Sequence, residues 1–288
     1  MVDGLLNKKV AFIIQARMQS TRLPGKILMP LPLGSNVPLL GRIVETLKIS
    51  KTNHTIIVAT SINGENNLLE TFCKESNVAC FRGSEDDVLS RFIDIVKNTD
   101  CDLIVRLTAD NPFIDAEILD FAIAEHLKSE ADYSSTKGLP LGMNLEIISK
   151  SALLSLVSKV LSTQDKEHVT LFLRKSGLYK LNIIEGFLKE SYGSLRLTVD
   201  YPSDYLVASA IFDIHSKTGI RVGLELVDYC IKNFPWIFES NQHNLQKYDC
   251  NTLVEEIEVV RPILKQLELN RIFKMLELEA KKNRDESI

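Results

Sequence analysis

The chain has 288 residues, of which 45% are apolar and 25% are charged. This composition suits a globular enzyme with a core of full size, and it excludes a largely disordered chain. The formal net charge of −4 excludes a broad basic surface for nucleic acid, so any anion site must be a local cluster of cations.

The first 130 residues alternate short apolar runs with longer stretches in which apolar residues recur at helical spacing. Three continuous apolar runs predict strands buried on both faces of a sheet, at residues 10–14, 56–59 and 103–105. Between them, helices are predicted to carry Leu39 and Leu68. This alternation predicts an α/β fold with a mostly parallel sheet flanked by helices, and ligands bind at the carboxyl ends of the strands in such sheets.

The second half of the chain is less regular. We expect strands at residues 145–148, 179–184 and 195–199, and helices at residues 152–161, 166–175 and 202–216. From Asn251 onward the chain is expected to be mostly helical and charged. These patterns predict an α/β domain over residues 1–220 and a mostly helical C-terminal extension over residues 221–288.

A basic loop, residues 15–26, directly follows the first predicted strand. It carries Arg17, Arg22 and Lys26, and Gly25 permits backbone geometry that is closed to other residues. Arginine can fork onto phosphate oxygens and lysine offers a compact charge, so the loop suits a nucleoside triphosphate. The alternative is an ordinary solvated loop, and its position at the carboxyl end of a strand weighs against that interpretation.

The string QARMQSTRLPGKIL, which begins at Gln15, is similar to the signature of SpsF-like nucleotidyltransferases of spore-coat polysaccharide synthesis. It also resembles the opening motif of CMP-KDO synthetases. The resemblance extends in patches to about residue 210 and implies a glycosyltransferase-A-like fold, with a mixed but mostly parallel sheet. It further implies a loop that wraps the triphosphate, with nucleotide contacts from Gln15, Ala16, Arg17, Arg22 and Lys26.

Two aspartates end later predicted strands. Asp110 lies in RLTADNP and Asp200 in LRLTVDYPSD, and strand-end carboxylates suit Mg²⁺, which takes oxygen ligands and keeps several waters. Taken alone, Asp110 could equally open an ordinary turn. Both strings resemble family motifs, and the resemblance implies that Asp110 and Asp200 hold Mg²⁺ and that Thr108 contacts the nucleotide. Ala109 stands where the family usually has glycine, and Asp204 is expected to be a cap or helix-face residue.

A third motif, RGSEDDVLSR at residues 82–91, is similar to the family pattern RGSEDDVLxR. A Gly–Ser turn that opens a helix presents free N–H groups, which suit a nucleobase or ribose. Arg82, Gly83 and Ser84 are therefore predicted to bind the nucleotide, although Ser84 could equally be a plain helix cap.

Two stretches resemble family segments near the acceptor sugar. PLGMNLE, at residues 140–146, implies acceptor contacts from Gly142, Asn144 and Glu146. DKEHVT, at residues 165–170, implies that Glu167 or His168 lines the acceptor pocket, and His168 could equally be a structural histidine.

The resemblance implies a Mg²⁺-dependent enzyme that transfers a nucleoside monophosphate, CMP from CTP, to a sugar or sugar acid. Pyrophosphate would leave, and the product would serve surface polysaccharide or glycoconjugate synthesis. Arg17, Lys26, Asp110 and Asp200 are the predicted catalytic residues, and they must meet around one triphosphate. The alternatives are a nucleotidyltransferase that uses another NTP or a phosphorylated acceptor, a glycosyltransferase that uses a nucleotide-sugar, and a non-catalytic nucleotide-binding protein.

The chain has five cysteines and no CxxC pair, which argues against a disulfide framework or a zinc site. Its N-terminal apolar run is too short for a signal peptide, and no stretch of about 18 apolar residues occurs. We therefore expect a cytoplasmic protein with neither a membrane nor a nucleic-acid partner. The helical extension could supply the contacts of a homodimer.

Overall fold

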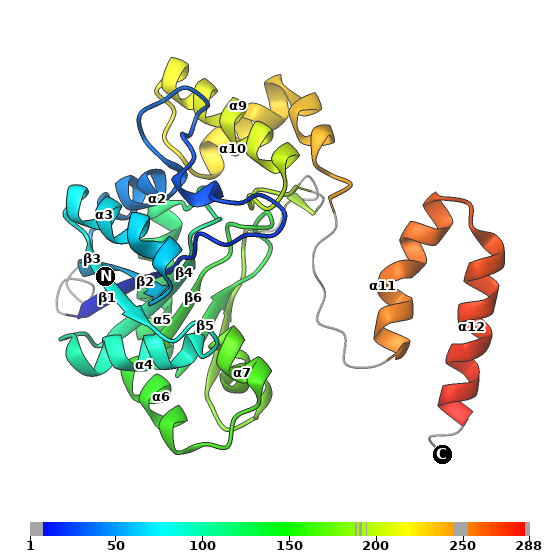
Figure 1. Cartoon of the computed structure of the whole chain (residues 1–288), viewed down its shortest axis with the longest axis horizontal. Coiled ribbons are helices and arrows are strands. Elements are labelled where there is room, and N and C mark those ends of the chain that lie inside the picture. The colour runs from blue at the N-terminus through cyan, green and yellow to red at the C-terminus, as the bar shows by residue number, and fades with distance from the viewer. Residues whose placement is uncertain (1–7, 188, 190–191, 194, 245–252, 286–288) are drawn as a thin grey trace. The chain divides into compact units, whose positions relative to one another are not determined.

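A computed structural model describes residues 8–187, 189, 192–193, 195–244 and 253–285. Within these residues the chain forms one seven-stranded sheet, in the order β3-β2-β1-β4-β6-β5-β7 (Figure 1). The strands are β1 (Lys9–Gln15), β2 (Asn53–Ser61), β3 (Ala79–Gly83), β4 (Leu103–Thr108), β5 (Tyr133–Thr136), β6 (Glu146–Ser149) and β7 (Leu181–Ile184). The three continuous apolar runs thus form β1, β2 and β4, as predicted, and they lie side by side.

The register of the sheet brings the ends of these strands together. β1 runs parallel to β2 and β4, and its last residue, Gln15, pairs with Ala59 and Thr108. β6 is antiparallel to β4 and sets Glu146 beside Arg106. The sheet is therefore mixed but mostly parallel at its centre, as expected, and the loops after β1 and β4 leave from the same edge.

Helices cover both faces of the sheet because successive strand residues point to opposite sides. Phe12 and Ile14 of β1 belong to one apolar core, and Ala11 and Ile13 belong to the other. In Figure 1, α2 and α9 lie on one side of the sheet, and α4 and α6 lie on the other. The helices of this part of the chain are α2 (Leu39–Leu47), α3 (Asn67–Glu75), α4 (Val88–Asn98), α5 (Ala116–Ser129), α6 (Lys150–Ser155), α7 (Thr163–His168), α8 (Leu171–Lys175), α9 (Pro202–Thr218) and α10 (Leu224–Asn233).

Three predictions for the second half of the chain are wrong in detail. Residues 195–199 do not form a strand, because they pair with the sheet region only through a single bridge between Arg196 and Leu141. The helix expected at residues 166–175 is split into α7 and α8 at Val169, whose φ is 56°. The helix expected at residues 152–161 ends earlier, as α6 followed by a 3₁₀ turn at Leu156–Ser158.

The chain divides into two compact units, Met1–His243 and Asn244–Ile288. The first unit extends beyond the expected boundary at residue 220, because Leu226 and Val227 of α10 are buried in the same core as β1. The second unit contains α11 (Leu253–Gln266) and α12 (Asn270–Asp285), which contact each other. Among the described residues, no helix has both the length and the apolar character needed to cross a bilayer.

Candidate active site

The basic loop after β1 has a defined fold. Gly25 adopts a φ of 70°, which only glycine reaches without strain, and its N–H donates to the carbonyl of Met18 over 3.1 Å. The N–H of Met18 donates to Asn66 Oδ1 over 2.9 Å, and Asn66 is itself fully buried. A 3₁₀ turn then begins at Lys26, and Ile27 is buried in the core. The loop is therefore closed on itself, with Lys26 directed toward the strand ends.

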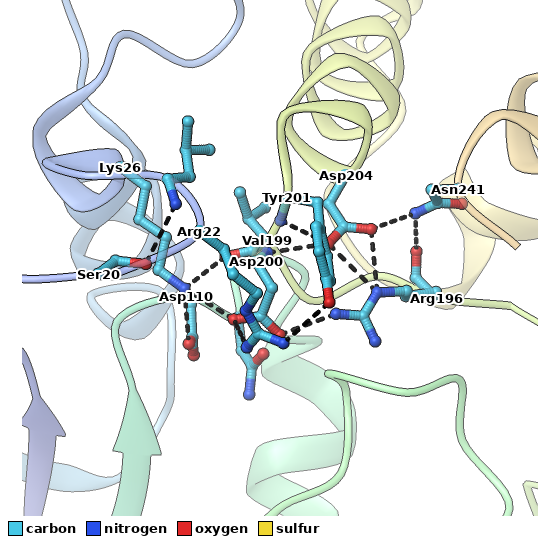
Figure 2. Close-up of polar contacts among 12 residues, drawn as sticks. Ser20, Arg22, Lys26, Asp110, Arg196, Val199, Asp200, Tyr201, Asp204 and Asn241 are labelled. Atoms are coloured by element: carbon cyan, nitrogen blue, oxygen red, sulfur yellow. Dashed lines mark hydrogen bonds and ion pairs between the residues drawn. The ribbon is translucent and has the colours of Figure 1, made fainter. Parts of the chain in front are cut away.

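Lys26 joins the two predicted metal ligands. Its Nζ lies 3.0 Å from Asp110 Oδ2 and 3.0 Å from Asp200 Oδ1, and it donates to the carbonyl of Val199 over 2.6 Å (Figure 2). The backbone N–H of Val199 donates to the carbonyl of Asp110 over 2.8 Å, which holds the two acidic segments together. The side chain of Lys26 is only 8% exposed, so this contact is shielded from solvent.

A second cation contacts Asp200 from the same loop. Arg22 Nη2 lies 3.0 Å from Asp200 Oδ1, and the guanidinium stacks over the ring of Tyr201 at 4.8 Å from its centroid. The side chain of Arg22 is about one-third exposed, which leaves part of the guanidinium open to the cleft. Figure 2 shows Arg22, Lys26 and the two aspartates converging from three separate segments.

Asp200 is also held on its other side by Arg196, which the sequence did not single out, and by Asp204. Arg196 Nη2 lies 2.8 Å from Asp200 Oδ2, and Arg196 Nε donates to Asp204 over 3.0 Å. Asp204 is buried and accepts the backbone N–H groups of Asp200 and Tyr201, each over 2.9 Å, so it caps α9 as expected. Asn241 Nδ2 donates to both the carbonyl of Arg196 and Asp204 Oδ1 over 2.9 Å.

This setting keeps Asp200 ionised. Burial by itself raises the pKa of the Asp200 carboxyl, but the ammonium of Lys26 and the guanidinium groups of Arg22 and Arg196 outweigh burial. The net pKa of Asp200 lies below its ordinary value. A charged carboxylate is therefore present at the site at neutral pH.

A cleft of about 520 Å³ opens over this cluster. It is lined by all four predicted catalytic residues and by most of the predicted nucleotide-binding residues, namely Gln15, Ala16, Arg17, Arg22, Lys26, Thr108, Asp110 and Asp200. The side chain of Arg17 is 67% exposed, and its nearest carboxylate in the described chain, Glu85, is 4.0 Å away. Glu85 is therefore a distant partner, and most of the Arg17 side chain stays open to solvent.

Arg82, Gly83 and Ser84 do not line this cleft. The guanidinium of Arg82 donates to three backbone carbonyls, those of Ser61, Ile62 and Asn63, and lies 3.0 Å from Glu70. The Ser84 hydroxyl accepts the N–H of Asp87 over 3.1 Å, and Asp87 in turn caps α4. These contacts give Arg82 and Ser84 structural tasks, and their nucleotide-binding role stays a prediction.

A second cavity, of about 330 Å³, shares Thr108 with the first. Gly142, Asn144 and Glu146 all line it, so three of the predicted acceptor residues lie together. Gly142 has a φ of +99°, and a Cβ there would lie 2.6 Å from the backbone nitrogen of Thr198. Only glycine therefore allows the chain to approach the segment at Thr198.

Glu146 is fully engaged by neighbouring side chains. It accepts from Arg106 over 2.6 Å, from the Tyr133 hydroxyl over 2.6 Å and from the Thr170 hydroxyl over 2.8 Å. Burial raises the pKa of the Glu146 carboxyl, but Arg106 and the two hydroxyls hold the net pKa below its usual value. Arg106 also donates to Gln15 Oε1 over 3.2 Å, so a partly buried chain of polar contacts runs from the second cavity to the first.

Glu167 and His168 lie apart from this second cavity. Both residues belong to α7, and Glu167 lines the nucleotide-sized cleft instead, while His168 lines neither cavity. The turn at Val169 directs the Thr170 hydroxyl to Glu146. The acceptor contacts expected of Glu167 and His168 stay predictions.

The residues at the cleft fit a magnesium ion that completes its shell with substrate and water. In the described chain, no group of three or more His, Cys, Asp or Glu side chains is arranged to hold a metal ion. Asp110 and Asp200 each lie 3.0 Å from Lys26 Nζ, so the ammonium occupies the point that their carboxylates share, and of their four carboxylate oxygens Asp110 Oδ1 has no contact in the described chain. Mg²⁺ is bound by one or two carboxylates plus substrate phosphates, and this donor set matches that requirement.

Sequence reasoning missed Arg91, which lines the same cleft and is only 4% exposed. A signal was present, because Arg91 interrupts an apolar stripe formed by Val88, Phe92 and Ile95 in the helical pattern. A charged residue on the buried face of a helix needs either a partner or a ligand.

Comparisons with known proteins show the family to which the chain is similar. The profile of a protein family described as Cytidylyltransferase matches residues 11–226. The chain is 37% identical over 218 residues to the spore coat polysaccharide biosynthesis protein SpsF of Bacillus subtilis, covering 74% of this chain and 88% of that protein.

Two solved structures have a similar fold. A cytidylyltransferase from Leptospira borgpetersenii serovar Hardjo-bovis superposes with a TM-score of 0.73 and 30% identity, over 84% of this chain and 100% of that one. CMP:2-keto-3-deoxy-manno-octonic acid synthetase, solved with CTP, gives a TM-score of 0.53 at 14% identity, over 72% of this chain and 99% of that one. The second likeness concerns the fold alone.

Proposed function

The chain belongs to the cytidylyltransferase family, and we propose that it transfers CMP from CTP to a sugar or sugar acid and releases pyrophosphate. One observation carries the proposal. The cations of the loop after β1 and the two strand-end aspartates meet at one cleft, and that cleft adjoins a second cavity. The first is suited to a nucleoside triphosphate and the second to an acceptor. The relationship to SpsF supports a role in surface polysaccharide synthesis.

In the proposed reaction an acceptor oxygen forms a bond to the α-phosphorus of CTP. The bond between that phosphorus and the oxygen bridging to the β-phosphate breaks, pyrophosphate takes the electron pair, and the proton of an acceptor hydroxyl is lost to the solvent. Positioning and charge neutralisation account for most catalysis of this kind. Arg17 and Arg22 would hold the β- and γ-phosphates, and both guanidinium groups already face the cleft.

Lys26 has a double task in this scheme. It keeps Asp110 and Asp200 close together by neutralising their repulsion, and its ammonium lies at the floor of the cleft. Asp110 and Asp200 would hold Mg²⁺ together with the nucleotide phosphates, which would supply further charge neutralisation at the reacting phosphate. Asp110 Oδ1 has no hydrogen-bond or ion-pair partner in the described chain, so it is available as a ligand.

The test is a panel of the four NTPs with Mg²⁺ and three acceptor types, scored by pyrophosphate release. The acceptors are 2-keto-3-deoxy-manno-octonic acid, a neutral hexose and a hexose phosphate. We expect pyrophosphate with CTP and at least one acceptor, together with a CMP-sugar of the matching mass. Release with a different NTP but not with CTP would contradict the base assignment. Consumption of a nucleotide-sugar in place of an NTP would indicate a glycosyltransferase.

A further inference from the structure

Arg91 of α4 is a buried cation without an ionic partner. It is 4% exposed and forms no ion pair within 4.0 Å in the described chain, although the charges of Glu85 and Asp87 act on it at longer range. Its Nε has no hydrogen-bond partner, and Nη1 only reaches the carbonyl of Ala59 at 3.5 Å, the limit of a hydrogen bond. Burying a charge in this way is unfavourable unless something pairs with it.

The surroundings of Arg91 make room for it. A Cβ at Gly83 would lie 2.8 Å from Arg91 Cγ, so glycine at this position leaves the space that the arginine stem occupies. The carbonyl of Ala59 that Arg91 approaches also accepts the N–H of Ala16, near the start of the basic loop. Arg91 therefore lies beneath the start of that loop and lines the cleft, although it takes no part in the Lys26 cluster.

The end of the cleft at Arg91 is unsuited to phosphate. Glu85 and Asp86 line it beside Arg91 and Val88, and their carboxylates would repel a phosphate group. The remaining cations of the cleft, Arg17, Arg22 and Lys26, come from the loop after β1, and of these Arg17 approaches Glu85 to 4.0 Å. A flat neutral ring that offers hydrogen-bond acceptors to a guanidinium and a donor to a carboxylate fits this end.

We propose that Arg91 reads the base of the nucleotide and selects cytosine over uracil, an inference that rests on the proposed function. Guanidinium groups only donate hydrogen bonds, and O2 and N3 of cytosine are neighbouring acceptors. The N4 amino group of cytosine would donate to Glu85 or Asp86. Uracil presents an N3–H donor and an O4 acceptor instead. Its N3–H would meet the guanidinium donors of Arg91, and its O4 would meet the carboxylate. Arg91, together with the carboxylate of Glu85 or Asp86, would therefore determine the base specificity.

The experiment measures the affinity of wild type, Arg91→Met and Arg91→Lys for CTP and for UTP by calorimetry with Mg²⁺, without acceptor. We expect wild type to bind CTP more tightly than UTP. In both variants the ratio of CTP affinity to UTP affinity should fall by at least about tenfold, which is the effect of losing one well-paired base contact. Lysine keeps the positive charge but lacks the planar guanidinium with its paired N–H donors. If only the charge of Arg91 mattered, Arg91→Lys would behave like wild type. Lys97→Met removes an exposed cation from the same helix and serves as the control.

The outcomes separate the inference from the proposed function. A wild-type preference for CTP that persists in Arg91→Lys and Arg91→Met overturns the role of Arg91 and leaves the function standing. A wild-type chain that prefers another base overturns the proposed function itself. If Arg91→Met does not fold, which a melting curve shows, the CTP/UTP ratio of Arg91→Lys decides the question.

Discussion

At the scale of single residues, the site balances its own charges. The connected cluster contains three cations and three carboxylates in the described chain: Arg22, Lys26, Arg196, Asp110, Asp200 and Asp204. An anionic triphosphate therefore needs further positive charge. Arg17, which contacts a carboxylate at 4.0 Å, and Arg91, which forms no ion pair in the described chain, line the same cleft, and a bound magnesium ion would add to their charge.

Asp110 offers the most direct test among these residues. Asp110→Ala should lower kcat by about 10² or more, because a lost electrostatic stabiliser of the transition state has an effect of that size. The fold should persist, since the carboxylate is 29% exposed and its backbone carbonyl still accepts from Val199. Pyrophosphate release at saturating Mg²⁺ measures the effect, with the exposed Asp94→Ala on α4 as control. Near-normal turnover in Asp110→Ala would remove this carboxylate from the mechanism.

At the scale of elements, the sequence predicted the central strands well because they are buried on both faces. Continuous apolar runs identify β1, β2 and β4 without knowledge of the partners. The sequence pattern predicted secondary structure less well in segments whose backbone conformation depends on contacts with residues far away in the chain. Leu195, Leu197 and Val199 look like a strand, but Arg196 between them is also buried, against Asp204, and the segment bonds to loops.

The same limit applies to side chains of the site. The basic loop and the strand-end aspartates were predictable, because chain order and strand ends place them. The pairing of Glu146 with Tyr133 was not, since β5 has only four residues and carries little pattern. Thr170 reaches Glu146 only because the predicted helix breaks at Val169, a backbone conformation that a β-branched residue rarely adopts.

A prediction for Gly142 concerns how closely the loop before β6 packs against the segment at Thr198. Gly142→Ala should destabilise the fold by more than Gly177→Ala, because both have φ near or above +70° but only Gly142 lacks space for a Cβ. The left-handed backbone alone costs about 1–2 kcal/mol, and the backbone contact at 2.6 Å adds to it. Urea unfolding of the two variants measures the difference. Equal free energies of unfolding would contradict the close approach.

His126 gives a second prediction, for the contact between α5 and β5. Burial lowers the pKa of His126 to about 4, and its Nδ1 lies 2.7 Å from the Ser134 hydroxyl. The unfolded chain takes up this proton near pH 6.5, well before the folded chain does. A pKa difference of one unit corresponds to about 1.4 kcal/mol. Titration of His126 should therefore lower the free energy of unfolding by about 3 kcal/mol as the pH falls from 6.5 to 4.

The matched variant is His126→Asn, which keeps a polar side chain and removes the titration. Urea unfolding at intervals from pH 7 to pH 4 should show a shallower loss of stability in His126→Asn than in wild type. Asp200 and Glu146, whose pKa values are lowered in the folded chain, also reduce stability below about pH 5, but they do so in both chains, so the difference between the two profiles reports on His126. Parallel pH profiles for the two chains would contradict a buried neutral His126.

At the scale of the whole molecule, the two compact units make separate predictions. The first unit contains both cavities and its own core, so a chain that ends at Asn244 should keep its melting temperature and its affinity for CTP. In the second unit, Ile272, Met275 and Leu278 of α12 are exposed. If these residues support the predicted homodimer, light scattering should give a dimer mass for the full chain and a monomer mass for the shortened one. A shortened chain that fails to fold would contradict the independence of the first unit.

The central claim is that the loop cations and the two aspartates act together on one bound CTP. Calorimetric titration of CTP into wild type, Asp110→Ala and Lys26→Met, each with and without Mg²⁺, tests it most directly. We expect Mg²⁺ to tighten CTP binding to wild type, this gain to disappear in Asp110→Ala, and Lys26→Met to bind CTP weakly in both conditions. CTP binding that is unchanged in Lys26→Met, together with an undiminished magnesium effect in Asp110→Ala, would contradict the claim.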